Sequence, residues 1–148
     1  MSAQYQVTLE WGLAGLRAAA AEVIVIADAD RGPETAELHG SAPRTSLVLD
    51  ATLVNASDIA QAALDEQVRI GERASIAIVA AGERWGDGSL RPSAADLLVA
   101  GRVVDALAEL GIDFHDPASA AACAAAVSLR GAAKSLVAAE AAARARAV

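Results

Sequence analysis

Two clusters of charged side chains follow stretches of the chain that have the pattern of buried strands. The first cluster is Asp28, Asp30 and Arg31. The second is Glu83, Arg84 and Asp87, and Asp96 follows at the first turns of the next predicted helix. Carboxylates are the ligands that Mg²⁺ prefers, and an arginine fork binds phosphate or sulfonate through two hydrogen bonds. The two clusters therefore predict a site for a small anionic phosphorylated metabolite together with Mg²⁺.

Three glycines accompany the second cluster and add to this prediction. Gly82, Gly86 and Gly88 can let backbone N–H groups approach an anion closely. Short loops of α/β domains are, however, rich in Asp, Arg and Gly for structural reasons, because turns and helix caps need them. Residue types alone therefore do not identify a site here, and the shared position after predicted strands is what favours one.

The elements that must position these residues alternate along the chain. Hydrophobic patterning predicts strands at 4–11, 22–27, 46–49 and 74–80, helices at 55–67 and 93–110, and alanine-rich helix from 116 onward with a break near Gly131. Gly, Pro, Ser and Thr indicate loops at 32–44 and 82–92. This alternation predicts one domain over residues 1–148, a layered α/β/α fold with a largely parallel sheet. In such sheets ligands bind beyond the carboxyl ends of the strands, where both charged clusters lie.

Composition excludes several classes of partner. The chain has 148 residues and a formal net charge of −7, so non-specific binding to nucleic acid or to an anionic membrane is not expected. The first residues lack the pattern of a signal peptide, and no apolar run reaches the roughly 18 residues of a membrane span. We therefore expect a cytoplasmic protein. Binding an anion would require local positive charge, a metal ion or backbone N–H groups.

The cysteine, the histidines and the lysine indicate less about function. The single cysteine, Cys123, lies in an alanine run and has the setting of a small buried hydrophobic residue. His39 and His115 have no histidine or cysteine at ligand spacing, so a zinc site is not predicted. Asp28-Ala-Asp30 resembles the start of the haloacid-dehalogenase-type phosphatases, in which the first Asp is the nucleophile and the second the acid/base. Lys134, the only lysine, follows every candidate loop, whereas the lysine of that family precedes its last acidic loop.

A longer resemblance concerns residues 81–107, AGERWGDGSLRPSAADLLVAGRVVDAL. This segment is similar to the corresponding stretch of the 2-phosphosulfolactate phosphatase (ComB) family, particularly its actinobacterial branch. Residues 53–60 resemble the family's L-x-N-A-S-x-V-A, and residues 7–16 its opening V-x-x-x-W-G-x-x-G. Asp28 and Arg31 could correspond to the ends of its D-V-L-R motif. The resemblance implies an Mg²⁺-dependent phosphoric monoester hydrolase that converts 2-phosphosulfolactate to sulfolactate and phosphate.

The resemblance also implies roles for individual residues. The implied catalytic residues are Asp28, Arg31, Glu83 and Asp96, and the implied Mg²⁺ ligands are Asp28, Asp87 and Asp96. The implied substrate-binding residues are Arg31, Asn55, Arg84, Gly82 and Gly86. In this chain the segment between Asp30 and Ser46 is shorter than in the family, and two of the family's loops have no counterpart in it. A second hypothesis is therefore a catalytically silent relative that binds a small anionic metabolite, or a homo-oligomer that associates through its alanine-rich C-terminal helices.

Overall fold

The computed structural model describes residues 4–146 and contains a parallel sheet with strand order β1-β4-β2-β3. The strands are β1 (Val7–Trp11), β2 (Val23–Ala27), β3 (Leu47–Ala51) and β4 (Ile76–Ala80). Their register is continuous, so that Val25 lies beside both Leu49 and Ile78. The predicted layered α/β/α fold with a parallel sheet is confirmed, and each strand ends within two residues of the last residue predicted for it, although β1 begins three residues later than predicted.

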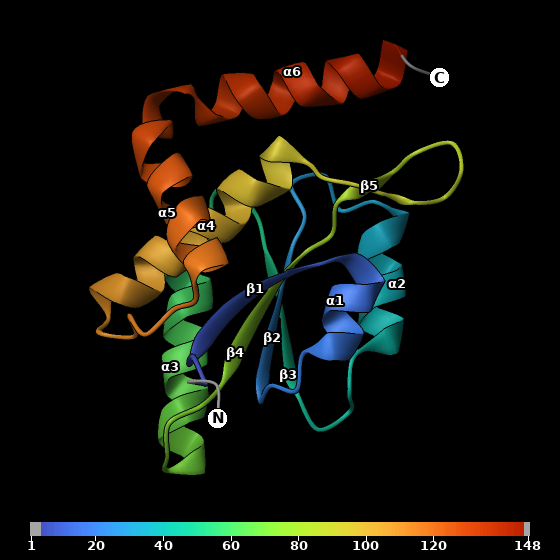
Figure 1. Ribbon diagram of the computed structural model, residues 1–148. Coiled ribbons are helices and arrows are strands. Elements are labelled where there is room, and N and C mark those ends of the chain that lie inside the picture. Colours follow the sequence, from blue (N-terminus) through green and yellow to red (C-terminus); the bar gives the residue numbers. More distant parts are fainter. Residues whose placement is uncertain (1–3, 147–148) are drawn as a thin grey trace.

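Helices cover both faces of this sheet (Figure 1). The short helices α1 (Gly12–Ala18) and α2 (Pro33–Ser41) lie on one face, and α3 (Ala56–Ile70) and α4 (Ala94–Glu109) lie on the other. Alternate residues of the central strands separate into the two layers of the core. In β2, Val23 and Val25 pack toward α3 and α4, whereas Ile24 and Ile26 pack with Leu38 of α2. The continuous apolar runs in the sequence follow from this burial on both faces.

The C-terminal part of the chain adds a third helical segment. Helix α5 (Pro117–Ser128) packs against α4, a 3₁₀ turn (Arg130–Ala132) follows, and α6 (Ala133–Arg146) continues at an angle of 66° to α5. Asp116 accepts a hydrogen bond from the N–H of Ser119 and caps α5, as the sequence predicts. Figure 1 shows α6 (red) running over the end of the sheet at which β2 and β4 finish. The C-terminal helix therefore lies where the strand-end loops are.

Two stretches that were predicted as loops form regular secondary structure. Residues 33–41, predicted as part of a loop from Gly32 to Arg44, form helix α2. Pro33 suits the first helical position because its missing N–H would be unpaired there in any case, and Leu38 is buried against the sheet. The predicted loop 82–92 contains a small antiparallel hairpin of β5 (Glu83–Arg84) and β6 (Leu90–Arg91). Helix α1 was not among the predicted elements.

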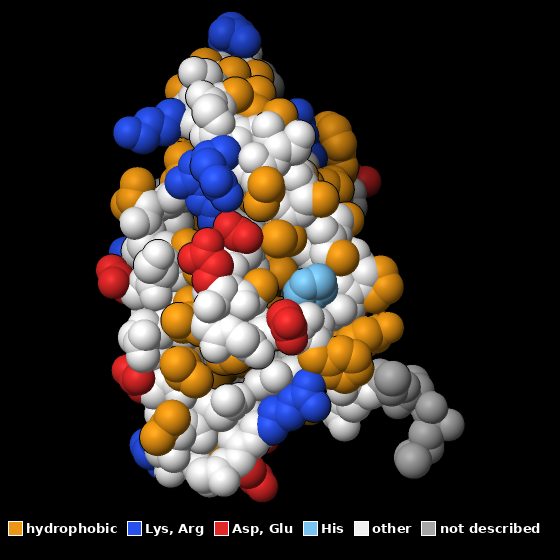
Figure 2. Space-filling view, turned by 90° about the vertical axis from the view of Figure 1, so that its left-hand side faces the viewer, with side chains coloured by type: hydrophobic (Ala, Val, Ile, Leu, Met, Phe, Trp, Pro, Cys, Tyr) orange, Lys and Arg blue, Asp and Glu red, His pale blue; other side chains and the backbone are white. Residues whose placement is uncertain are grey.

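The surface is mixed in character. Figure 2 shows a face on which hydrophobic side chains are interspersed with basic and acidic ones. In residues 4–146, no single helix has the length and apolarity of a membrane span, and only α5 and α6 taken together across their bend meet those criteria by length and composition.

Candidate functional site

A polar cavity lies between the loops that follow the neighbouring strands β2 and β4. Its volume is about 360 Å³, and it is lined by Asp28, Asp30, Gly32, Pro33, Glu34, Gly82, Glu83, Arg84, Arg91, Asp96 and Arg144. The helix after β2 covers one face of the sheet and the helix after β4 covers the other. The backbone therefore diverges at this point and opens the crevice in which open parallel sheets bind ligands. Four of the predicted catalytic and substrate-binding side chains, Asp28, Glu83, Arg84 and Asp96, meet there.

Asp28 at the end of β2 organises the loop that leads into α2. Its carboxylate accepts hydrogen bonds from the backbone N–H groups of Asp30, Arg31 and Gly32, and from the hydroxyl of Thr35. Each carboxylate oxygen thus already accepts two hydrogen bonds. Asp28, which was predicted to be a nucleophile or an Mg²⁺ ligand, therefore stabilises the backbone of this loop.

Asp96 in the first turn of α4 connects the two strand-end loops. Ser93 caps α4 by accepting a hydrogen bond from the N–H of Asp96. The Asp96 carboxylate then accepts one hydrogen bond from the N–H of Ala29 and one from the N–H of Gly82, both 2.9 Å long. Burial raises the pKa of Asp96 to about 7, and the nearby Asp28 acts in the same direction, while the two backbone hydrogen bonds oppose the rise. Near neutral pH this buried carboxyl therefore exchanges a proton.

The hairpin places its side chains on two sides. Glu83 lies opposite Arg91, and both line the polar cavity. Arg84 lies opposite Leu90, and these two side chains line a second, apolar cavity, although Arg84 borders the polar one as well. Successive residues of a strand point to opposite faces, which explains this division. The guanidinium of Arg91 stacks on Trp85, with its Cζ 4.5 Å from the ring centroid.

Two glycines make room for the hairpin. Gly82 and Gly12 have φ values of 68° and 63°, in the region that favours glycine. A Cβ on Gly82 would lie 2.6 Å from Leu90 Cδ1, and one on Gly12 would lie 3.1 Å from the same atom. Leu90 therefore packs directly against two stretches of backbone and holds the hairpin over the ends of β1 and β4.

Helix α6 supplies two residues to the site that were not predicted from the sequence. Arg144 Nη2 lies 2.7 Å from Asp30 Oδ2, and Arg144 Nε lies 2.8 Å from Glu83 Oε1 without the alignment of a hydrogen bond. Glu140 accepts hydrogen bonds from the hydroxyl of Ser93 and from the N–H of Ala95, at the start of α4. These contacts join α6 to both strand-end loops. The only signal in the sequence is the pair of charges four residues apart on one helix face.

The pKa values of the neighbouring Glu83 and Glu140 are shifted in opposite directions. Burial raises the pKa of Glu83, the charge of Arg144 opposes this, and the neighbouring Glu140 adds to it. Burial also works against ionisation of Glu140, but hydrogen bonds from Ser93, Ala95 and Glu83 outweigh it and lower the pKa of Glu140. The two carboxyl groups are thus arranged so that Glu83 holds a proton more readily than Glu140.

Other predicted site residues lie outside the polar cavity. Arg31, whose φ is 51°, turns toward β3 and forms an ion pair with Asp50 at 3.2 Å. Asn55 accepts a hydrogen bond from the N–H of Thr52 and donates one to the carbonyl of Asp50, which fixes the turn before α3. Asp87, in the hairpin turn, accepts hydrogen bonds from the N–H and hydroxyl of Ser89. Gly86 is also in this turn, where a Cβ would meet nothing within 4 Å.

The expected Mg²⁺ ligands can be tested against these positions. Asp28 and Asp96 line the cavity, but Asp87 does not. Across the described residues, no group of three His, Cys, Asp or Glu side chains is arranged to hold a metal ion. The guanidinium of Arg144 lies between Asp30 and Glu83 and supplies positive charge to the cavity instead. The structure therefore brings two of the three expected Mg²⁺ ligands to the cavity, and Mg²⁺ binding there stays a prediction.

Comparison with family models, with curated proteins and with solved structures found no match. The resemblance to the 2-phosphosulfolactate phosphatase family therefore stays a prediction from the motifs, and function has to be argued from the cavity itself.

Proposed function

We propose that this domain binds a small phosphorylated acid in the polar cavity between β2 and β4, with arginines as its anion-binding groups. The observation that carries this proposal is the convergence of Arg84, Arg91 and Arg144 on one cavity, in a chain whose net charge is −7. Two of these residues come from the hairpin and the third from α6. Guanidinium groups bind phosphate and carboxylate through paired hydrogen bonds, which suits a ligand with two anionic groups.

The acids of the cavity are largely engaged by the protein. Asp28 receives four hydrogen bonds, and burial raises the pKa of Asp96 to about 7, which favours its uncharged form. Arg144 offsets the charges of Asp30 and Glu83. Repulsion of an incoming anion is therefore weaker than the number of carboxyl groups suggests.

Two of the arginines are available to a ligand. Arg84 pairs with Glu37 at 2.6 Å, but both side chains are more than one third exposed, and such a pair contributes only up to about 1 kcal/mol. Arg91 stacks on Trp85 and leaves the guanidinium edge for hydrogen bonds. An anion can therefore replace Glu37 on Arg84 at small cost, and the free edge of Arg91 offers a second binding group on the other side of the hairpin.

Direct binding measurements test this function. Titration of the full chain with inorganic phosphate and with 2-phosphosulfolactate, followed by calorimetry, should give saturable binding that weakens as salt increases. Arg91→Ala should weaken both affinities about tenfold, since a hydrogen bond to a charged group contributes about 1.5–3 kcal/mol. Arg69→Ala is the matched control, because Arg69 is exposed on α3 and pairs with Glu66 away from the cavity. Equal effects of the two substitutions, or no binding by the wild-type protein, would contradict the proposal.

Hydrolysis of a phosphoric monoester is a second candidate function, and one observation favours it. Asp96 and Glu83 line the same cavity and both have a raised pKa, and a raised pKa favours the protonated form that a general acid needs. Phosphate release from 2-phosphosulfolactate and from an aryl phosphate should then be measured with and without added Mg²⁺. Turnover that Glu83→Gln abolishes while phosphate still binds would support hydrolysis. Binding without turnover under either condition would leave the binding function alone.

A further inference from the structure

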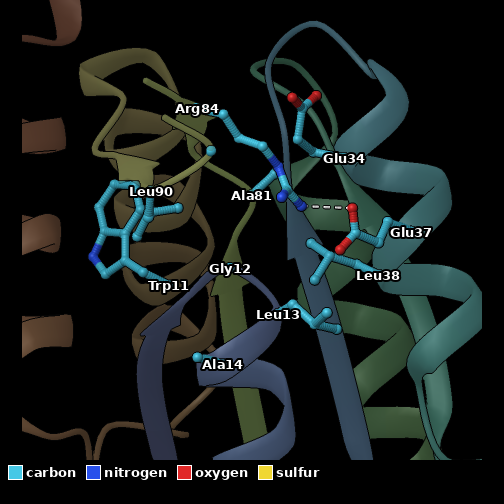
Figure 3. Close-up of a pocket in the computed structure, with 11 residues that line it drawn as sticks. Trp11, Gly12, Leu13, Ala14, Glu34, Glu37, Leu38, Ala81, Arg84 and Leu90 are labelled. Carbon is cyan, nitrogen blue, oxygen red and sulfur yellow. Dashed lines mark hydrogen bonds and ion pairs between the residues drawn. The ribbon is translucent and has the colours of Figure 1, made fainter. Parts of the chain in front are cut away.

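A second cavity adjoins the polar one beneath the hairpin. Six apolar residues form most of its lining: Trp11, Leu13, Ala14, Leu38, Ala81 and Leu90. Figure 3 shows Trp11 and Leu90 on one side of this apolar cavity, Leu13 and Leu38 on the other, and Ala81 between them. These residues come from the carboxyl ends of β1 and β4, from helices α1 and α2, and from the hairpin. The apolar cavity thus belongs to the same edge of the sheet as the polar site.

The two cavities share the side chains of Glu34 and Arg84. In Figure 3, Arg84 reaches from the hairpin across the mouth of the apolar cavity toward Glu37 on α2. The guanidinium of Arg84 therefore stands at the boundary between an arginine-lined space and an apolar one. A ligand whose anionic group pairs with Arg84 can therefore place its remaining atoms in either of these two spaces.

The size of the apolar cavity sets what it can hold. Its volume is about 210 Å³. A dry protein cavity of about 150 Å³ lined by Leu, Ile and Phe binds benzene. One six-membered ring or a short branched alkyl group therefore fits under the hairpin. Burial of such a group contributes affinity in proportion to the apolar area removed from water.

We propose that the apolar cavity is a specificity subsite, which takes an aromatic or branched alkyl group attached to the anion bound by Arg84. This inference rests on the proposed binding function and deepens it. It names the class of ligand: a small amphipathic monoester or acid, with its charged end among the arginines and its apolar end against Trp11, Leu13 and Leu38. A small, wholly polar phosphorylated acid leaves this subsite unfilled.

Paired ligands provide the test. Phenyl phosphate should bind the full-length protein about tenfold more tightly than methyl phosphate, which has the same anionic group without the ring. Ala14→Phe should remove that preference by filling the apolar cavity from an exposed position on α1, so that phenyl phosphate binds this variant no more tightly than methyl phosphate does. Ala18→Phe is the control, since Ala18 is also exposed on α1, one helical turn away and outside the apolar cavity. Equal affinities for the two phosphates in the wild-type protein would overturn the subsite and leave the binding function standing.

A neutral probe separates the two proposals if no phosphate binds. Benzyl alcohol should shift the methyl resonances of Leu13, Leu38 and Leu90 in the wild-type protein and not in Ala14→Phe. Such shifts without phosphate binding would contradict the anion-binding function and retain the apolar cavity as a binding site. Absence of these shifts together with absence of phosphate binding would overturn both proposals.

Discussion

Asp96 in the first turn of α4 accepts a 2.9 Å hydrogen bond from the backbone N–H of Gly82, directly after β4. The other oxygen of the same carboxylate accepts from the N–H of Ala29, after β2. One buried side chain therefore fixes the separation of the two strand-end loops between which the polar cavity opens. An acid at this position is needed to build the cavity, whatever reaction or ligand the cavity serves.

Asp96 should make an identifiable contribution to the pH dependence of stability. Its folded pKa of about 7 lies above its unfolded value near 3.8, so the folded state binds more protons than the unfolded state between these values. The contribution of Asp96 to the free energy of unfolding should therefore fall as pH rises from about 4 to about 7. Urea denaturation at several pH values should show that the difference between wild type and Asp96→Asn decreases over this window.

The control for this experiment is Asp87→Asn, because the contribution of Asp87 to stability depends on pH in the opposite direction. Hydrogen bonds from the hydroxyl and N–H of Ser89 lower the pKa of Asp87. Its contribution is therefore present above its unfolded pKa and is lost as pH falls through the folded one, and it should stay nearly constant between about pH 5 and 7. A difference between wild type and Asp96→Asn that stays constant from pH 4 to 7 would contradict the ionisation assigned to Asp96.

Gly82→Ala should destabilise the protein more than Gly88→Ala does. Both glycines have positive φ, so both substitutions should cost about 1–2 kcal/mol of backbone strain. Only at Gly82 does the new Cβ meet other atoms, Leu90 Cδ1 at 2.6 Å and the backbone oxygen of Arg91 at 3.2 Å, and because the Leu90 side chain can shift this should add about 1 kcal/mol. Thermal unfolding should show the larger loss for Gly82→Ala. Combining it with Leu90→Ala should give less than the sum of the two losses, because Leu90→Ala removes the clashing atom; strict additivity would show that Leu90 does not pack on Gly82.

Gly101→Ala tests the close packing of α4 against α5. A Cβ on Gly101 would lie 2.0 Å from the carbonyl oxygen of Ala122, so the two helices would have to separate. We expect a loss of about 2–3 kcal/mol in the free energy of unfolding. Gly40→Ala in α2 should instead stabilise by about 0.5–1 kcal/mol, since a Cβ there meets nothing within 4 Å. Urea denaturation of both variants checks the contrast, and a neutral Gly101→Ala would mean that the helices are not in this contact.

Arg31→Ala should leave phosphate affinity within about twofold of the wild type, because the Arg31 side chain pairs with Asp50 and does not line the polar cavity. The motif resemblance implies the opposite, since it assigns substrate binding to this residue. Calorimetric titration with inorganic phosphate decides between them. A loss of phosphate affinity as large as that of Arg91→Ala would show that Arg31 takes part in binding.

Strands and helix caps could be predicted from local pattern. The continuous apolar runs of β2 and β4 are those of strands buried on both faces, and Ser93 and Asp116 cap the helices that they were expected to begin. Helix α2 was missed because its Gly, Pro, Ser and Thr content indicates a loop, and Leu38 is its one buried side chain. Its start is fixed instead by hydrogen bonds from Gly32 and Thr35 to Asp28. That contact cannot be recognised before the helix is known.

By itself, the sequence determined that β2 and β4 are buried strands and that charged residues follow them. The reason is that apolar periodicity and turn chemistry act over a few neighbouring residues. Only the tertiary structure decided which of those charges share a cavity. It turned Arg31 toward β3 and brought Arg144 of α6 to Glu83, which lies far away in sequence. Helix α6 is anchored there by Glu140, whose hydrogen bonds to Ser93 and Ala95 form only when both helices are packed. Burial likewise raised the pKa of Asp96, a property that depends on the fold around the carboxyl group.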